Sequence, residues 1–119
     1  MSTTATLATH LLAKAESNDI DDLRPDWKHS DTGPDVAQID DDLTFICTLP
    51  KDWIGTTDDI EAAIDEAMRN VVRKYLRDET NSPDIAIYDC DRDGHATLAL
   101  TGEGIEVMWT VYVEATVTN

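Results

Sequence analysis

The stretch LALTGEGIEVMW (residues 98–109) predicts two antiparallel strands joined by a two-residue turn. Gly102-Glu103 suits a type II′ turn, which takes Gly at its first central position. This turn places apolar residues opposite one another: Leu100 with Ile105, and Leu98 with Val107. Because side chains alternate between the two faces of a strand, these apolar residues share one face, which is expected to be the buried face of a sheet.

Upstream, Asp93-Gly94 predicts a second hairpin, because a type I′ turn requires a positive φ at both central positions. The two turns together predict a three-stranded C-terminal meander made of Ile85–Cys90, His95–Thr101 and Ile105–Val117. In this register the apolar residues of all three strands fall on one face, and that agreement supports the meander.

Thr57–Arg77 predicts a long helix that covers this face. Thr56 or Thr57 can cap its N-terminus, and acidic side chains in its first turn and basic ones in its second half suit the helix dipole. Its apolar positions cover nearly half of the circumference, which is wider than a minimal core-facing stripe. We therefore expect the helix to contact two surfaces: the sheet, and either the N-terminal helix or another subunit.

Leu43–Leu49 predicts a further strand, rich in β-branched and aromatic residues and ended by Pro50. By the period of two, its apolar residues Leu43, Phe45, Cys47 and Leu49 share one face. Thr4–Glu16 has apolar residues at helical spacing and predicts a short helix, for which Asn18 is a C-cap candidate. The core is expected to contain large apolar residues of the long helix and the strands: Phe45, Ile64, Val71, Leu98 and Trp109.

Between the predicted helix Thr4–Glu16 and the predicted strand Leu43–Leu49 lies an acidic, polar segment that is expected to form a long loop at about residues 19–42. Within it, Val36–Ile39 is expected to form a short edge strand, and Trp27 to pin the loop to the core rather than to bind a ligand. The predicted fold class is α+β: a long helix packed on an antiparallel sheet with a C-terminal three-stranded meander, plus a short N-terminal helix. A chain of 119 residues has the size of one domain, so a single domain over residues 1–119 is expected.

The chain carries 25 Asp and Glu against 9 Lys and Arg, a formal net charge of −16. The acids are spread along the chain, most are Asp, and Lys is scarce, a composition that resembles that of proteins from extreme halophiles. Such a charge repels itself unless salt screens it. The alternative is a mesophilic acidic protein that binds a basic partner. In both cases contact with nucleic acid is not expected, because that binding depends on Lys and Arg.

No apolar run is long enough to cross a membrane, and the N-terminus lacks the basic start and apolar centre of a signal peptide. We therefore expect no membrane contact, and a protein that is intracellular or assembled inside a cell. Cys47 and Cys90 are isolated, lack the spacing of metal ligands, and are expected to be buried free thiols.

Asp89–Gly94 begins like a calcium-binding loop, with acids at positions 1, 3 and 5 and Gly at position 6. Leu100 occupies position 12, where such a loop needs a bidentate Glu, and a hairpin accounts for the glycine. The three histidines are far apart in sequence, and no metalloprotease, phosphate-loop or nucleophile-elbow motif is present. We therefore expect no enzyme, no metal and no cofactor; an active site assembled from distant residues is the alternative.

Arg69, Arg73 and Arg77 recur every four residues and form one basic stripe on the predicted long helix. One interpretation is i,i+4 pairing with neighbours such as Asp65, together with compensation of the helix dipole. The other is contact with an acidic surface, such as the Asp-rich loop of another copy of the chain. The three arginines and Trp53 are the candidate interface residues.

The order of elements is a short helix, a long loop, a strand ending in Leu49-Pro50, a long helix, and a meander that closes on a strand containing Glu106–Ala115. This pattern spans most of the chain and resembles the small tail-terminator proteins of tailed phages and, more loosely, their head–tail neck proteins. The resemblance implies a non-enzymatic ring, commonly of six subunits, that caps the tail tube and joins it to the head. The last strand is also longer than usual, which predicts backbone groups free to pair with another chain.

Together with the acidic composition, the resemblance implies a structural protein in the virion of a tailed virus of halophilic archaea, assembled in the host cytoplasm. Its partners would be further copies of itself and neighbouring virion proteins, in the role of tail terminator or head–tail connector. Two alternatives are a cytoplasmic halophilic module that binds a partner or ligand through an open sheet face, and a small enzyme subunit.

We expect cooperative folding in about 3 M KCl and loss of structure in about 0.1 M KCl, because only molar salt screens the repulsion among the uncompensated negative charges. Circular dichroism melting curves recorded across this salt series measure the effect. A melting temperature that does not change between the two concentrations would contradict the halophilic interpretation.

Overall fold

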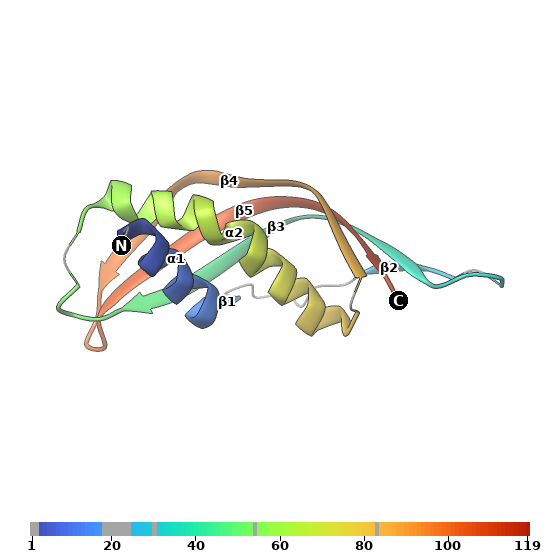
Figure 1. Cartoon of the computed structure of the whole chain (residues 1–119), viewed down its shortest axis with the longest axis horizontal. Helices are drawn as coiled ribbons and strands as arrows, with labels where there is room; N and C mark the ends of the chain where they lie inside the picture. The colour runs from blue at the N-terminus through green and yellow to red at the C-terminus, as the bar shows by residue number, and fades with distance from the viewer. Residues whose placement is uncertain (1–2, 18–24, 30, 54, 83) are drawn as a thin grey trace.

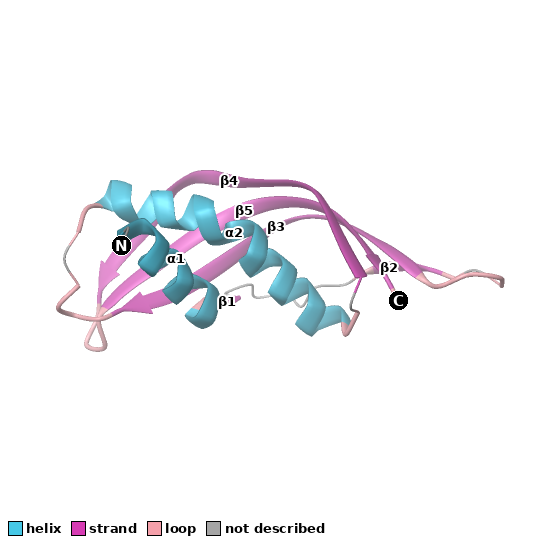
Figure 2. Ribbon diagram, in the orientation of Figure 1, coloured by secondary structure: helices cyan, strands magenta, loops and turns pink. Residues whose placement is uncertain are grey.

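Figures 1 and 2 show the computed structural model of the chain, which describes residues 3–17, 25–29, 31–53, 55–82 and 84–119. Within these residues the chain forms two helices and one antiparallel sheet. In chain order the elements are α1 (Thr3–Lys14), β1 (Glu16–Ser17), β2 (Asp26–Lys28), β3 (Val36–Leu49), α2 (Thr57–Thr80), β4 (Asp84–Leu100) and β5 (Ile105–Thr118). The predicted α+β class is confirmed, with the short and the long helix in their expected places. Asn18, the expected C-cap of the short helix, lies outside the described residues.

β5 is the central strand of the sheet, whose order is β1-β3-β5-β4, with β2 also paired to β3. It pairs with β3 from Ile105 to Thr118, and with β4 over the same length apart from two irregularities. The long last strand therefore finds its backbone partners inside the chain, and the prediction that it is free to pair with another chain is wrong. β4 forms one edge of the sheet, and β1 and β2 flank β3 at the other.

Both helices lie on one face of the sheet, and no described helix or strand covers the other face (Figure 1). Because side chains alternate along a strand, the apolar residues of each strand gather under the helices. On the two inner strands the buried residues of this covered face are Ala37, Ile39, Leu43, Phe45, Cys47 and Leu49 of β3, and Val107, Trp109, Val111, Val113, Ala115 and Val117 of β5. The expected apolar faces of both strands are confirmed.

A capping box starts α2. The Thr56 hydroxyl accepts a hydrogen bond from the Asp59 N–H (3.1 Å), and the Asp59 carboxylate accepts one from the Thr56 N–H (2.9 Å). These bonds satisfy two amide groups that have no partner within the helix. The helix ends three residues beyond the predicted Arg77, because Asn81 adopts the left-handed conformation (φ 54°) that terminates helices.

The wide apolar arc of α2 packs against both the sheet and α1, as the sequence predicted. Seven of its residues are buried: Ile60, Ala63, Ile64, Ala67, Val71, Val72 and Leu76. Because α1 covers the part of the arc that the sheet does not, the arc needs no second subunit. Neither described helix is both long and apolar enough to cross a bilayer.

β3 runs without interruption from Val36 to Leu49, through three consecutive aspartates. The sequence predicted a strand only from Leu43, and a separate edge strand at Val36–Ile39. Both predictions are wrong in this respect, because β5 pairs with every residue of β3 and β2 flanks its first residues on the other side. The predicted acidic loop therefore ends at residue 35. Trp27, in β2, packs half-buried against the core as expected.

β4 is one strand from Asp84 to Leu100, so the predicted three-stranded meander is a two-stranded hairpin. The positive φ of Gly94 (76°) serves a bulge instead of a turn. Asp93 lies opposite Thr110 and Thr97 opposite Met108, so residues 94–96 face a single residue of β5. An Asp-Gly pair supplies the same left-handed residue to a bulge as to a hairpin, and β5 is long enough to pair with the whole of β4.

The two-residue turn between β4 and β5 is confirmed. The Thr101 N–H donates to the Gly104 carbonyl (2.8 Å) and the Gly104 N–H donates to the Thr101 carbonyl (3.3 Å). Leu100 lies opposite Ile105, and Leu98 opposite Val107, as predicted. The type II′ geometry is wrong, because the glycine with positive φ is Gly104 (150°) and not Gly102. A Cβ at Gly104 would collide with the carbonyl oxygen of Leu49, which ties this turn to β3.

Four of the five residues predicted for the core are buried: Phe45, Ile64, Val71 and Trp109. Leu98 is 39% exposed and Leu100 is 83% exposed, although both belong to the covered face. Arg92 and Ala96 of β4 donate hydrogen bonds to side chains of α2, and the two leucines lie further along the strand than these contacts. Leu98 is therefore at an open end of an edge strand, which corrects the prediction that it is a core residue.

Replacing Ile64 with Ala should reduce the free energy of unfolding by roughly 2–5 kcal/mol, because it removes a fully buried side chain from a packed core. The matched control is Leu100→Ala on the edge strand, which should cost less than about 0.5 kcal/mol because the side chain is already in solvent. Urea unfolding in high salt measures both. Equal losses at the two sites would contradict the placement of α2 on the sheet.

Candidate functional site

The uncovered face of the sheet is strongly acidic. Burial of the apolar face leaves the polar residues of β3, β5 and β4 pointing away from the helices. The carboxylates on this open face are Asp40, Asp42, Asp84, Asp89, Asp91, Asp93, Glu106 and Glu114. No Lys or Arg of these three strands points to the same face. We call this surface the open acidic face.

Tyr112 lies at the centre of the open acidic face. Its hydroxyl lies 2.7 Å from Asp40 Oδ1 and 2.9 Å from Glu114 Oε1. The hydrogen bonds to these two carboxylates, first Asp40 and then Glu114, raise the pKa of Tyr112. On the neighbouring strand, a hydrogen bond that the protonated Asp91 carboxyl donates to Asp89, together with the negative charge of Asp89, raises the pKa of Asp91. Carboxylates therefore crowd one another here, and the positive charge of Arg69 only partly offsets the rise in the pKa of Asp91.

Tyr88 stands beside this cluster and is 67% exposed. It lies at the first irregularity of β4, between Ile87 and Asp89, where the pairing with β5 is interrupted. A hollow of about 250 Å³ adjoins it, lined by Gln38, Ile39, Asp40, Tyr88, Glu114, Ala115 and Thr116. The open acidic face thus combines an exposed aromatic ring with two carboxylates in one depression.

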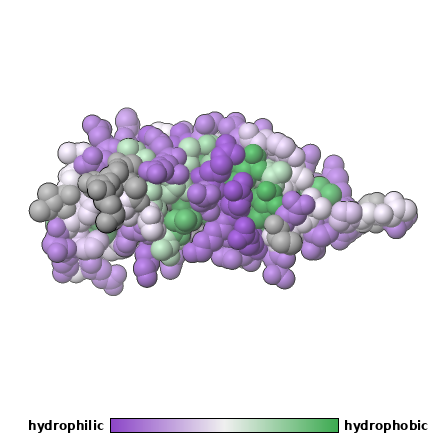
Figure 3. Space-filling model, in the orientation of Figure 1, coloured by the Kyte–Doolittle hydropathy of each residue, from purple (hydrophilic) through white to green (hydrophobic). Residues whose placement is uncertain are grey.

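The helical side of the molecule carries the predicted arginine stripe, but the structure divides it. Arg69 Nη1 donates to the carbonyl oxygen of Ile87 (3.1 Å), so this arginine fastens α2 to β4. Arg73 and Arg77 line a hollow of about 440 Å³ between α1 and α2, together with Thr9, Leu12, Ala13, Asn70 and Lys74. In Figure 3 the second half of α2 forms a hydrophilic band across this side, between two hydrophobic areas. We call Arg73 and Arg77 the basic pair.

The basic pair has no ion-pair or hydrogen-bond partner among the described residues. The i,i+4 pairing with Asp65 that the sequence left open is absent there, because Arg92 occupies that carboxylate. Arg92 Nε donates to Asp65 Oδ1 (2.8 Å) and Nη2 donates to Oδ2 (3.2 Å). Two cations of a protein of net charge −16 therefore have no side-chain partner among the described residues, although Arg77, in the last turn of α2, is placed to interact favourably with the helix dipole.

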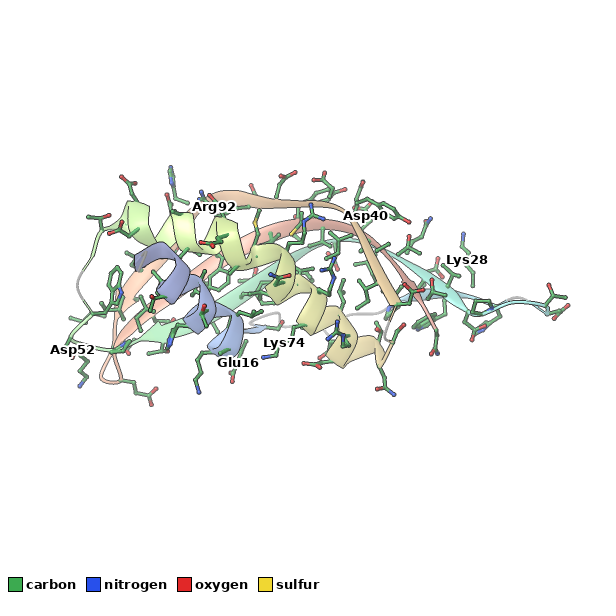
Figure 4. The ribbon with its side chains drawn as sticks, in the orientation of Figure 1. Glu16, Lys28, Asp40, Asp52, Lys74 and Arg92 are labelled. Carbon is green, nitrogen blue, oxygen red and sulfur yellow. The ribbon has the colours of Figure 1, made fainter. Side chains whose placement is uncertain are left out.

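Glu61 makes a further contact between α2 and β4, which the sequence did not predict. Glu61 Oε1 accepts hydrogen bonds from the Ala96 N–H (3.2 Å) and from His95 Nδ1 (2.9 Å), and lies 3.4 Å from Arg92 Nη1. The His95 hydrogen bond, then the Ala96 N–H and the charge of Arg92, lower the pKa of Glu61. Figure 4 shows Arg92 where β4 passes α2. These groups hold the bulge of β4 against the helix.

Trp53 is half-buried and packs against the core, and its ring covers Gly55, where a Cβ would meet ring atoms at 2.5 and 2.6 Å. Its contact with another chain stays a prediction. A further hollow of about 430 Å³ lies between α1, β1 and α2. Apolar residues such as Phe45 and Tyr75 line it together with charged ones such as Lys14 and Glu79.

Asp89–Gly94, the segment with the start of a calcium-loop pattern, is extended strand within β4. The three histidines lie apart: His10 contacts the Thr48 carbonyl, His29 contacts Asp35, and His95 contacts Glu61. Within the described ranges, no group of three or more His, Cys, Asp or Glu side chains is arranged to hold a metal ion.

Cys47 and Cys90 are buried free thiols, as expected. Burial raises the pKa of Cys47 to about 11 and also raises the pKa of Cys90, so both thiols stay protonated at neutral pH. Comparison of the chain with protein-family models, with curated proteins and with solved structures gives no match. The open acidic face and the basic pair are therefore the features from which a function is argued.

Glu61→Gln should weaken the acid sensitivity of folding. The pKa of Glu61 is lower in the folded chain than its ordinary value of 4.5, so its contribution to stability is present above that value and is lost as the pH falls through the folded pKa. The decrease in urea midpoint between about pH 6 and about pH 3 should therefore be smaller in the variant than in the wild type. Glu66→Gln, at an exposed position on the same helix, is the control. Identical decreases in wild type and Glu61→Gln would contradict this role.

Proposed function

We propose that the chain is a non-enzymatic structural protein of a tailed virus of halophilic archaea. In this proposal six copies form a ring that caps the tail tube or joins the head to the tail. Its partners are further copies of itself and neighbouring virion proteins, and the ring is assembled in the host cytoplasm. The acidic composition supports the proposal. So does the part of the predicted order that the structure retains: a short helix, a strand ending at Leu49, a long helix and a long C-terminal strand.

The observation that carries the proposal is a projecting β-ribbon. Figure 1 shows β2 and the start of β3 extending past the C-terminus, away from the helices. The molecule is accordingly elongated, with extents of 55 × 31 × 22 Å. Val36, the first residue of β3, pairs with Thr118 of β5, and residues 31–34, which precede it, are exposed. Figure 4 shows Lys28 on this ribbon.

Contacts within the monomer contribute little stability to the tip of the ribbon. It has no core of its own. His29 Nδ1 contacts Asp35 Oδ1 (3.0 Å), both of them at least partly exposed, and the Asn119 N–H donates to the Asp35 carbonyl (2.9 Å) at the base of the tip. A surface ion pair of this kind contributes little to stability. A ribbon that reaches away from its own core is placed to contact a neighbouring subunit, as expected of an assembly protein.

A second candidate is the cytoplasmic halophilic module that binds a partner or ligand. The hollow of about 430 Å³ between α1, β1 and α2 favours it, because this volume falls in the range of small-molecule sites. A monomer that retains a small molecule in this hollow after purification would replace the virion proposal.

The proposal predicts that the wild-type protein forms rings as its concentration is raised in about 3 M KCl. Because Lys28 lies opposite Val36, residues 29–35 can be replaced by an Asn-Gly turn without changing the strands. This shortened variant should keep the circular dichroism spectrum of the wild type and should fail to assemble. Light scattering coupled to size exclusion, with electron microscopy of the largest species, measures both. A wild type that stays monomeric at every concentration would contradict the proposal.

A further inference from the structure

We infer that neighbouring copies associate head to tail, with the helical side of one copy on the open acidic face of the next, so that Arg73 and Arg77 meet the carboxylates around Tyr112. This inference rests on the proposed self-assembly and names the two surfaces that would form the contact.

The first argument is charge complementarity within one chain. The open acidic face has eight carboxylates, and no Lys or Arg of its three strands points to it, whereas the basic pair has no partner among the described residues. Two open acidic faces would repel each other. The helical side also carries acids, such as Asp78 and Glu79, but the basic pair offers cations that can meet the carboxylates of a neighbouring open acidic face.

The second argument concerns the hydrogen bonds at the centre of the face. A phenol has one proton, so Tyr112 can donate to Asp40 or to Glu114 but not to both at the same time. One carboxylate oxygen near the ring is therefore always without that donor. A guanidinium group has five N–H donors in a planar fork that fits carboxylates, and its face can stack on an exposed aromatic ring such as Tyr88. An arginine from a neighbour meets these requirements together.

The third argument is geometric. The basic pair belongs to α2, on the side of the sheet that the helices cover, and the open acidic face lies on the other side of the sheet (Figure 1). An interface between two different patches on opposite sides of a protomer is heterologous, and it produces a ring when the rotation between copies closes. This is the symmetry that the proposed function needs.

Association along the edge of the sheet is less suitable. At β4 the carbonyl of Ile87 is occupied by Arg69, two irregularities break the pairing, and Asp89, Asp91 and Asp93 bring negative charge. Bulges and charged residues of this kind protect edge strands from pairing with other chains. The flat faces of the molecule therefore fit self-association better than the edge of β4 does.

Exchanging the charges tests the contact. One variant, Arg73→Glu with Arg77→Glu, replaces the basic pair with two acids; the other, Asp40→Arg with Glu114→Arg, places two cations beside Tyr112, where the arginines of a neighbour are inferred to bind. Neither variant should assemble alone, because like charges then meet at this contact. A 1:1 mixture should assemble as an alternating ring, because each reversed surface finds its complement on the other variant. Asp52→Arg with Glu103→Arg, at exposed loop positions, is the control for net charge and should assemble like the wild type.

A conservative variant separates fork geometry from charge alone. Arg73→Lys with Arg77→Lys keeps both charges but loses the planar fork, so the concentration of half-assembly should rise about tenfold or more. Light scattering in about 3 M KCl reports all of these variants, and circular dichroism checks that each one folds.

The outcomes distinguish the two proposals. If the wild type assembles and Arg73→Glu with Arg77→Glu assembles equally well alone, the inferred contact is wrong and the ring proposal stands. If the mixture of the two charge-reversed variants fails while each is folded, the pairing of these two surfaces is likewise wrong. If the wild type never assembles, the proposed function fails, and the inferred contact fails with it.

Discussion

The pairing of β5 with a strand on each side is the constraint on which the rest of the structure depends. β5 lies between β3 and β4, and both neighbours follow it from Ile105 to Thr118. Its alternation of apolar and polar residues therefore decides which face of the whole sheet is buried, because a shift of one residue would exchange the two faces. The apolar face requires a cover, and α1 and α2 provide it.

This arrangement also separates the charges of the protein. Acidic residues on alternate positions of three neighbouring strands are brought onto one surface, so the open acidic face is denser in negative charge than the linear sequence indicates. The arginines of α2 remain on the other side, where Arg69 is used inside the chain and the basic pair is not. In molar salt such charges act only over about 3 Å, so direct contacts matter more than long-range attraction.

The candidate site was only partly predictable. The arginine stripe follows from helical spacing, and the sequence placed all three arginines on one helix. Which arginines lack a partner depends on β4, because the carbonyl of Ile87 accepts a hydrogen bond from Arg69, and Arg92 donates to the Asp65 carboxylate. The contact between Tyr112 and Asp40 joins residues 72 positions apart, and no local pattern in the sequence signals it.

By itself, the sequence determined the elements whose signals are local: α2 with a threonine cap at position 56 or 57, the apolar face of β3, and the two-residue turn before β5. Periodicity and capping act within a few residues, so they can be read along the chain. Only the tertiary structure decided how Asp93-Gly94 and the aspartates of β3 are used. An Asp-Gly pair serves a turn or a bulge equally, and three aspartates disfavour a strand until a neighbour binds their backbone. The length of β5 decides both cases. If β3 and β4 were shorter, backbone groups of β5 would have no hydrogen-bond partner, so both strands continue through these residues.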